Sequence, residues 1–387
     1  MTRAASLFLS GGLLASIWSP VSAQSDLHRT AFHDFRVVPV AEGFEVPWSI
    51  AFLPGGDILV TERAGRLRIV RDGRLLPDPV PGIPEVVARG QGGLMDVVPH
   101  PGFASNRMIY ISYSKPREDL GRGGTTAVIR GTFENDRFTL VDEIFEAVSR
   151  GGGHYGCRLA FDADGYLYLS VGDRMASPTG DLAAHPAQDL SNHHGVIVRL
   201  NDDGSVPGDN PFAGREGARP EIWSYGHRNP QGLAIHPGTG AVWLTEHGPQ
   251  GGDEVNVSTA GANYGWPVIG YGVNYRSGTA IHPSTHAEGM EQPVHIWVPS
   301  IGVSGLAFYT GDKFPEWRGN LFAGGLSGRQ VDRLVIEDGE VVASETILRG
   351  MGRVRDVRQG PDGYIYVALS ARGGDKTPIV RLEPAGY

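Results

Sequence analysis

The 387-residue sequence contains a single cysteine, Cys157. One cysteine cannot form an internal disulfide, so the fold must be stabilised by its hydrophobic core or by bound metal. A reactive thiol needs neighbours that a sequence does not reveal, and a lone cysteine is more often a small buried residue. We therefore expect Cys157 to be structural.

Several common catalytic signatures are also missing. The sequence has no G-x-x-x-x-G-K-[ST] phosphate loop, no H-E-x-x-H, no G-x-S-x-G and no C-x-x-C-H. Their absence argues against nucleoside triphosphatases, zincins, nucleophile-elbow hydrolases and attached c-type haem. Basic residues are also fewer than acidic ones, with 34 Lys and Arg against 43 Asp and Glu for a net charge of −9. This balance argues against nucleic acid or an anionic membrane as a partner.

Only the N-terminus has a long apolar run. Arg3 precedes a mostly apolar stretch over residues 4–18, and Val21-Ser22-Ala23 forms a small-residue cleavage pattern before Gln24. The run is shorter than the roughly 20 residues of a membrane span, and no second candidate follows. The pattern predicts a signal peptide over residues 1–23, with an uncleaved anchor as the alternative. We expect a periplasmic or secreted protein without a membrane span after cleavage.

Glycine and proline are abundant instead, with 56 and 27 residues and no collagen period, which indicates turns between many short strands. A unit of apolar strand, turn and second strand recurs along the chain. Around Phe161 it turns at Asp164-Gly165 into the strand 166–169. Equivalent positions in the six copies are Phe52, Val98, Phe161, Ile235, Phe308 and Val357.

Propeller blades need about 40–50 residues, and the longer spacings between these copies leave room for loop insertions. The pattern predicts an all-β chain in which residues 24–387 form a single six-bladed β-propeller. A pair of β-sandwiches or a parallel β-helix are the alternatives, although β-helix coils are shorter than these repeats.

Polar residues concentrate in four insertions: 90–94, 151–158, 226–232 and 246–254. Arg228 could bind a carboxylate through two parallel hydrogen bonds, and the Gly248-Pro249 turn with nearby carboxylates suits a hard cation such as Ca²⁺. Arg353 and Arg355 alternate, so in a strand they share one face and suggest an anionic ligand. Each segment also has a plain interpretation as a solvated loop or a surface ladder.

Together, these segments resemble the soluble quinoprotein sugar dehydrogenases, which use pyrroloquinoline quinone (PQQ). The resemblance runs from Pro47-Trp48-Ser49 to residues 359–363, and its most specific stretches are 90–94, 154–173, 227–233 and 246–267. It implies a six-bladed propeller that oxidises aldoses at C1 to lactones with PQQ and Ca²⁺. The electrons then leave to an external acceptor.

The resemblance also implies roles for individual residues. His154 matches the catalytic base, and Asp253 matches an acid close to it that could orient the imidazole. The matched cofactor residues are Gln91, Arg228, Asn229, Tyr275, Ser327, Gly328, Arg353 and Arg355. The matched calcium ligands are the carbonyls of Gly248 and Pro249, with Glu254 and Tyr264 at a second ion.

The sequence departs from glucose dehydrogenase at three places. Ser327-Gly328 stands near the position of a lysine beside the quinone, Gly153 stands where an acid precedes the base, and Cys157 replaces a small Gly or Ser. These differences bear on the substrate more than on the cofactor. The competing hypotheses are a calcium-dependent propeller lactonase, which would hold its ion with side chains in the channel, and a non-catalytic recognition propeller.

Overall fold

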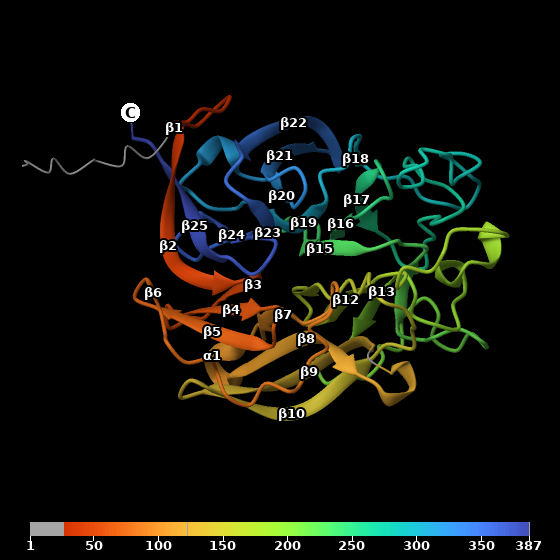
Figure 1. Cartoon of the computed structure of the whole chain (residues 1–387), viewed down its shortest axis with the longest axis horizontal. Helices are drawn as coiled ribbons and strands as arrows, with labels where there is room; N and C mark the ends of the chain where they lie inside the picture. Colours follow the sequence, from red (N-terminus) through yellow and green to blue (C-terminus); the bar gives the residue numbers. More distant parts are fainter. Residues whose placement is uncertain (1–26, 122, 387) are drawn as a thin grey trace, which may run out of the picture.

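The computed structural model describes residues 27–121 and 123–386, which are almost entirely β-structure (Figure 1). Their strands form six antiparallel sheets arranged as the blades of a β-propeller, which confirms the predicted fold class. The predicted signal peptide lies outside the described residues. Within them, no helix is long and apolar enough to cross a membrane.

Blades 1 to 5, numbered here in chain order, are four-stranded meanders in which neighbouring strands follow one another in the chain. They comprise β3 (Pro47–Phe52), β4 (Ile58–Glu62), β5 (Arg66–Arg71) and β6 (Arg74–Leu75); β7 (Leu94–Pro99), β8 (Met108–Pro116), β9 (Gly124–Glu134) and β10 (Arg137–Glu146); β11 (Leu159–Phe161), β12 (Leu167–Val171), β13 (Val196–Leu200) and β14 (Ile222–Tyr225); β15 (Pro230–Ile235), β16 (Val242–Glu246), β17 (Asp253–Ser258) and β18 (His295–Trp297); and β19 (Val303–Phe308), β20 (Leu321–Gly325), β21 (Gln330–Glu337) and β22 (Glu340–Arg349). The short helix α1 (Phe103–Asn106) and four 3₁₀ turns (Glu118–Leu120, Leu182–Ala184, Pro186–Gln188, Pro315–Trp317) lie between strands.

The sixth blade closes the ring with both ends of the chain. It contains β23 (Arg353–Gln359), β24 (Ile365–Ser370) and β25 (Lys376–Pro384) from the C-terminal end, followed by β2 (Phe35–Glu45) and β1 (Leu27–His28). Strand β2 pairs with β25 from Phe35–Pro384 to Glu45–Lys376, and Figure 1 shows these red and blue strands side by side. The two ends of the chain are thereby joined by backbone hydrogen bonds within this blade, and β2 leads directly into β3 of the first blade.

All six repeat positions named from the sequence fall on the innermost strand of a blade, β3, β7, β11, β15, β19 or β23. These strands contact one another in that order, and β23 contacts β3. The turns follow the sequence signals as well. The Asp162 carboxylate accepts hydrogen bonds from the backbone N–H of Asp164 and Tyr166, at 3.0 and 2.9 Å, and closes the Asp164-Gly165 turn.

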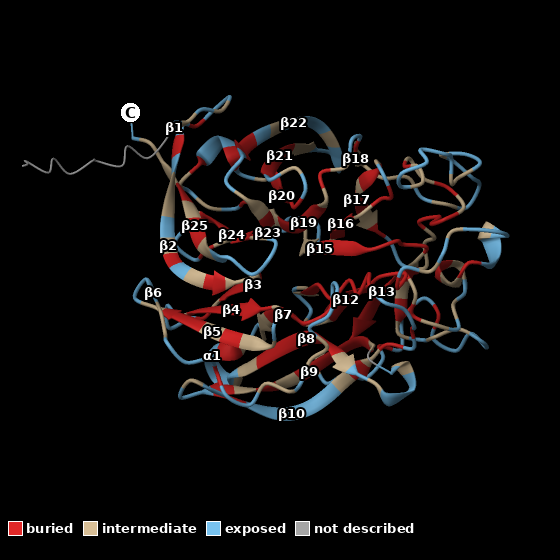
Figure 2. Ribbon diagram, in the orientation of Figure 1, coloured by how far each residue is buried: buried red, intermediate tan, exposed pale blue. Residues whose placement is uncertain are grey.

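The hydrophobic core is divided into layers between adjacent blades (Figure 2). One cluster packs β4 and β5 against β8, and five others fill the remaining interblade spaces. A seventh group lies near the axis and contains Trp48, Met95, Tyr155 and Cys157. Each blade thus buries both of its faces, which explains why its inner strands are rich in apolar residues.

Buried charges near the axis connect blades 1, 2, 3 and 6. Arg158 Nη1 lies 3.0 Å from Asp356 Oδ1, and Arg358 Nη2 donates to Asp96 Oδ1 at 3.0 Å. The same carboxylates accept backbone N–H groups of Leu159 and Ile50. Since each carboxylate is paired and hydrogen-bonded, this network fixes how the blades meet.

Candidate active site

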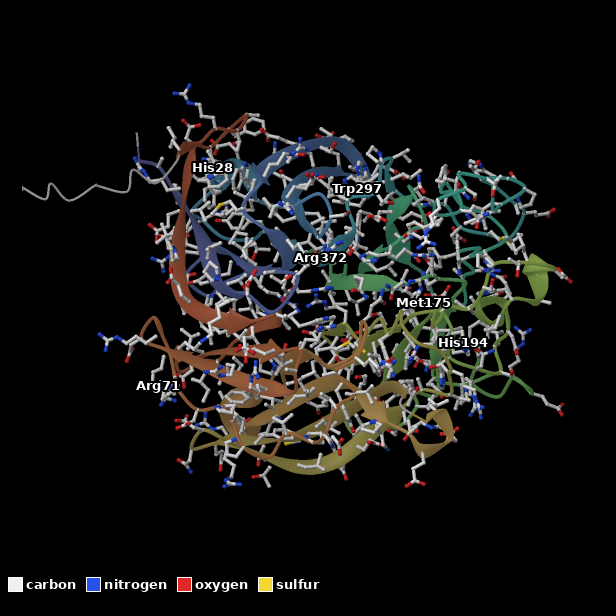
Figure 3. The ribbon with its side chains drawn as sticks, viewed as in Figure 1. His28, Arg71, Met175, His194, Trp297 and Arg372 are labelled. Atoms are coloured by element: carbon white, nitrogen blue, oxygen red, sulfur yellow. The ribbon has the colours of Figure 1, made fainter. Side chains whose placement is uncertain are left out.

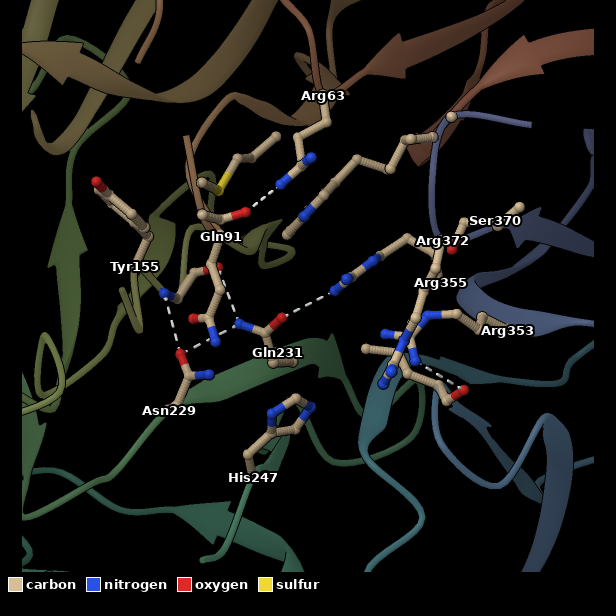
Figure 4. A pocket seen from close by; sticks show the side chains of 18 of the residues that line it. Arg63, Gln91, Tyr155, Asn229, Gln231, His247, Arg353, Arg355, Ser370 and Arg372 are labelled. Carbon is tan, nitrogen blue, oxygen red and sulfur yellow. Dashed lines mark hydrogen bonds between the residues drawn. The ribbon is translucent and has the colours of Figure 1, made fainter. Parts of the chain in front are cut away.

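A central pocket of about 580 Å³ opens at one end of the propeller channel (Figure 4). Its lining comes from segments at the starts of the innermost strands and the ends of the second strands. One side carries the amides of Gln91, Asn229 and Gln231, which we call the amide wall. The other carries Arg353, Arg355 and Arg372, which we call the arginine wall, while Arg63 lies near Gln91 and donates to the Gly90 carbonyl. Because equivalent strands run the same way in every blade, insertions at the same blade position meet at one end.

His154 lies beside the amide wall and is 6 % exposed. Its backbone N–H donates to Gln91 Oε1 at 2.7 Å, and its Nδ1 lies 2.6 Å from Asp173 Oδ1. The backbone of His154 is left-handed, with φ of 43°. A Cβ at Gly172 would come within 2.3 Å of the His154 carbonyl oxygen, so only glycine permits this packing.

Asp173 is itself fixed by further donors. Its Oδ2 accepts from the indole N–H of Trp266 at 2.8 Å, and its Oδ1 accepts from the backbone N–H of Met175 at 2.9 Å. Burial would raise the pKa of this carboxyl, but the hydrogen bond and charge of His154, together with Arg228, lower it overall. Asp173 is therefore a stable carboxylate at neutral pH.

The pKa of His154 is lowered. Burial is the main cause, the Asp173 hydrogen bond opposes it, and the positive charges of Arg228 and Arg174 add to the lowering. The ring is therefore neutral at pH 7. Since ionised Asp173 can only accept, Nδ1 carries the hydrogen, and Nε2 is left with a free lone pair.

The structure corrects the expectation that Asp253 orients this imidazole, because Asp173 occupies that place. Asp253 accepts from the backbone N–H of Gly248 at 3.1 Å and of Val303 at 2.9 Å. It therefore shapes the Gly248-Pro249 turn and fixes it to the next blade.

Arg228 faces this turn. Its Nη1 donates to the carbonyl oxygens of His247 at 2.9 Å and Gly248 at 2.7 Å, and its guanidinium lies 5.2 Å from the ring centre of Trp266. The buried Glu246 accepts from the backbone N–H of Arg228 at 2.7 Å and holds the loop in place. Backbone carbonyls of the turn thus already face a positive charge.

A small cavity of about 20 Å³ lies behind the turn, next to Gly248, Pro249, Glu246, Glu254 and Tyr264. Burial, and then the charge of Glu246, raise the pKa of Glu254. The Tyr264 hydroxyl is engaged with the backbone of Val257 and Thr259, so only its carbonyl could join a metal. Across the described ranges, no three His, Cys, Asp or Glu side chains are grouped to hold a metal ion. A cation here would depend on backbone carbonyls.

The arginine wall contains the predicted pair. Arg355 Nη1 donates to Gln231 Oε1 at 3.0 Å, and Arg353 Nη1 reaches the Leu326 carbonyl at 3.3 Å. Burial, and then the charges of Arg353, Arg158 and Arg63, lower the pKa of Arg355 to about 9. Its Nε, and Nε2 of His247 on the pocket floor, are buried without a hydrogen-bond partner among the described residues.

Three predicted cofactor residues lie elsewhere. Tyr275 is 61 % exposed on the long loop after β17 and lines neither the central pocket nor the small cavity. The N–H groups of Ser327 and Gly328 bond the Ile301 carbonyl, which turns Ser327 into a neighbouring surface pocket. Leu326 takes their place in the central pocket.

Sequence reasoning missed Asp173, Gln231, Arg63 and Arg372 at this site. Asp173 and Gln231 both lie within stretches that carry the resemblance. The sequence therefore marked these segments as functional, but it did not show which residues the two side chains contact. Arg63 and Arg372 follow ordinary strands, and no local signal distinguishes them.

The comparisons with known proteins agree with this geometry. The family model described as glucose/sorbosone dehydrogenase matches residues 44–381. The chain belongs to this family. It is therefore an oxidoreductase, as the resemblance implied.

Relatives of the family align over most of their length. The aldose sugar dehydrogenase YliI of Escherichia coli is 46 % identical over 349 residues, covering 87 % of this chain and 90 % of that protein. An uncharacterised Synechocystis protein, slr1608, is 45 % identical over 363 residues, covering 90 % and 87 %.

Solved structures of the family also share this fold. A glucose dehydrogenase structure has a TM-score of 0.83 at 43 % identity, covering 91 % of this chain and 99 % of that one. The PQQ-bound aldose sugar dehydrogenase of Streptomyces coelicolor has a TM-score of 0.71 at 29 % identity, covering 90 % and 98 %.

Proposed function

We propose that this protein oxidises the C1 hydroxyl of aldoses to lactones with PQQ and Ca²⁺, and that His154 is the general base. The observation that carries the proposal is the buried His154–Asp173 pair beside a pocket whose opposite wall is lined by arginines. The names of the E. coli and Streptomyces relatives support the same substrate class and cofactor.

The central pocket suits the quinone. Its volume lies in the range of cofactor sites, and PQQ carries three carboxylates that match the guanidinium groups of Arg353 and Arg355. The unpartnered Nε of Arg355 and Nε2 of His247 are two further polar atoms that a bound acid or carbonyl could satisfy. On the amide wall, Gln91 and Asn229 would hold the polar edge of the ring system.

The Gly248-Pro249 turn suits calcium. The Gly248 carbonyl now accepts from Arg228, whose guanidinium lies where a cation is favourable, and carbonyl oxygen is a preferred ligand of Ca²⁺. Nearby, burial and then the charge of Glu246 raise the pKa of Glu254 to about 8, and a bound cation would stabilise the ionised form of this carboxyl. When bound, the two groups would supply a two-electron acceptor and a Lewis acid.

The chain itself provides the proton transfer. His154 Nε2 takes the proton of the anomeric hydroxyl, and Asp173 stabilises the resulting imidazolium through Nδ1–H. Trp266 and the Met175 N–H keep the carboxylate aimed at the ring. The base is therefore fixed before the sugar binds.

A lactonase of the calcium-propeller type is not favoured. Such an enzyme would need side-chain ligands for its ion in the channel, whereas the central pocket is lined by arginines and amides. It would also leave the arginine wall without a purpose.

Reconstitution tests the proposal. Apoprotein mixed with PQQ and Ca²⁺ should reduce an artificial acceptor only when an aldose is added. If no aldose supports reduction of the acceptor, the proposed function is wrong. The His154→Ala variant should bind PQQ normally in a spectroscopic titration but lose turnover by about 10²–10⁴-fold. A near-normal kcat in this variant would remove His154 as the base.

A further inference from the structure

The arginine wall holds more positive charge than its described neighbours offset. Among the residues that line the central pocket, Arg63, Arg353, Arg355 and Arg372 are accompanied by no Asp or Glu. The chain as a whole carries a net charge of −9, so this local excess runs against the global balance. Arg372 lies near the middle of the ring in Figure 3.

An outer pocket of about 530 Å³ adjoins the central pocket. The two share Leu326, Arg353, Ser370, Ala371 and Arg372, so Arg353 and Arg372 stand in the wall between them. Arg329 extends the positive lining, and Asp375 is the one acidic residue in it.

The arginines of the outer pocket are not held by carboxylates. Arg329 and Arg372 are exposed, and within residues 27–121 and 123–386 their side chains form no hydrogen bond or ion pair. Their charges act on Arg353, where burial first, and then Arg372 and Arg329, lower the pKa. Three neighbouring guanidinium groups that repel one another favour an anionic occupant.

The position of the outer pocket indicates which anion. It is lined by residues of blades 5 and 6, whereas His154 and Asp173 belong to the loops around β11 and β12 across the central pocket. A sugar must bring its C1 hydroxyl within hydrogen-bond reach of the base, and its hydride close to the hydride acceptor. Electrons can pass from one pocket to the other through the residues that the two pockets share, without such contact. The outer pocket therefore fits the electron acceptor and not the sugar.

We propose that Arg329 and Arg372 form a binding site for an anionic electron acceptor beside the cofactor pocket. The inference rests on the proposed function. Oxidation of one aldose to the lactone releases two electrons and two protons. Two molecules of a one-electron acceptor take the electrons, one each, and the protons go to solvent.

The test uses the PQQ- and calcium-loaded enzyme and two acceptors of opposite charge. The Arg329→Gln variant, whose arginine lines the outer pocket and not the central one, should raise KM for ferricyanide about threefold, since one lost ion pair contributes about that much. KM for the cationic phenazine methosulfate and for glucose should stay unchanged. Arg137→Gln, an exposed arginine at the start of the outer strand β10, is the matched control and should change none of them.

Binding gives a readout independent of turnover. Hexacyanocobaltate, an inert trianion of the same shape as ferricyanide, should bind the loaded wild type in calorimetry and bind the Arg329→Gln variant about threefold more weakly. An unchanged ferricyanide KM, or a rise for both acceptors, would overturn the inference. If the substitution raises KM only for a sugar that carries a carboxylate, such as glucuronate, the outer pocket binds substrate, and the inference is overturned as well. Aldose-dependent reduction of phenazine methosulfate tests the proposed function separately.

Discussion

Replacing Asp173 with asparagine should disable the base without removing it. In the wild type, the carboxylate lies 2.6 Å from His154 Nδ1 and is 1 % exposed, so water screens the pair very little. Hydrogen bonds to charged groups contribute about 1.5–3 kcal/mol, and one pKa unit corresponds to 1.36 kcal/mol. Losing the charge should therefore lower the pKa of His154 further below its already lowered value.

The sign of the pH effect follows from the role of the base. His154 must be unprotonated to accept a proton, so kcat/KM falls as the pH drops through its pKa. In Asp173→Asn that fall should begin at lower pH than in the wild type. The plateau should also drop by about 100-fold or more, because the imidazole is a weaker base and an asparagine N–H can reverse its tautomer.

The assay is a pH profile of kcat/KM with PQQ and Ca²⁺ at saturation. Asp253→Asn is the matched control, because Asp253 is equally buried but bonds Gly248 and Val303. It should weaken calcium binding and leave the acid limb in place. An acid limb that stays fixed or moves to higher pH in Asp173→Asn would refute the reasoning, as would one that moves only in Asp253→Asn.

Three further predictions concern stability, calcium and the thiol. Asp356→Ala removes the carboxylate nearest to buried Arg158 and leaves the guanidinium with Asp96 at 3.5 Å, so it should cost about 3–5 kcal/mol in urea unfolding, whereas exposed Asp78→Ala should change little; equal effects would contradict the role of the axial network. In Gly248→Ala the new Cβ would lie 2.0 Å from the Gly252 carbonyl, so calcium affinity in calorimetry should fall about tenfold or more, unlike in Gly208→Ala, where nothing is close. Burial raises the pKa of the Cys157 thiol to about 12, so Ellman's reagent should react only after unfolding, and rapid labelling of the native protein would argue against a structural cysteine.

The six-fold repeat could be predicted from the sequence because the strands and turns of each blade are encoded locally. Positions such as Phe161 and Phe308 lie on innermost strands whose apolar side chains and turns are encoded within a few residues. The strand pairing that closes the ring could not be predicted from the sequence. Pairing of β2 with β25 joins residues more than 300 positions apart, and neither segment carries a mark that distinguishes it from any other strand.

The candidate site shows the same division between local chemistry and closure of the ring. The alternation of Arg353 and Arg355 predicted that both would face one ligand, and both line the central pocket although a bulge interrupts the register between Val354 and Asp356. Their neighbours could not be inferred in this way, since Arg63 follows β4 and Arg372 follows β24 in different blades. Only the closed ring brings them together.

Asp173 is the most informative residue that the sequence-based prediction omitted. It lies at the end of a segment that carries the resemblance, yet no contact with His154 was predicted for it. It follows β12 after one residue, 19 residues after His154, whereas Asp253 stands close to the Gly248-Pro249 turn that the sequence predicted to bind calcium. The choice depends on backbone conformation. His154 and Arg174 both have positive φ, of 43° and 61°, which ordinary residues seldom adopt and which no propensity predicts. Left-handed residues in both loops turn the two side chains toward each other, so the His154–Asp173 pair depends on strained backbone that the surrounding blades must stabilise.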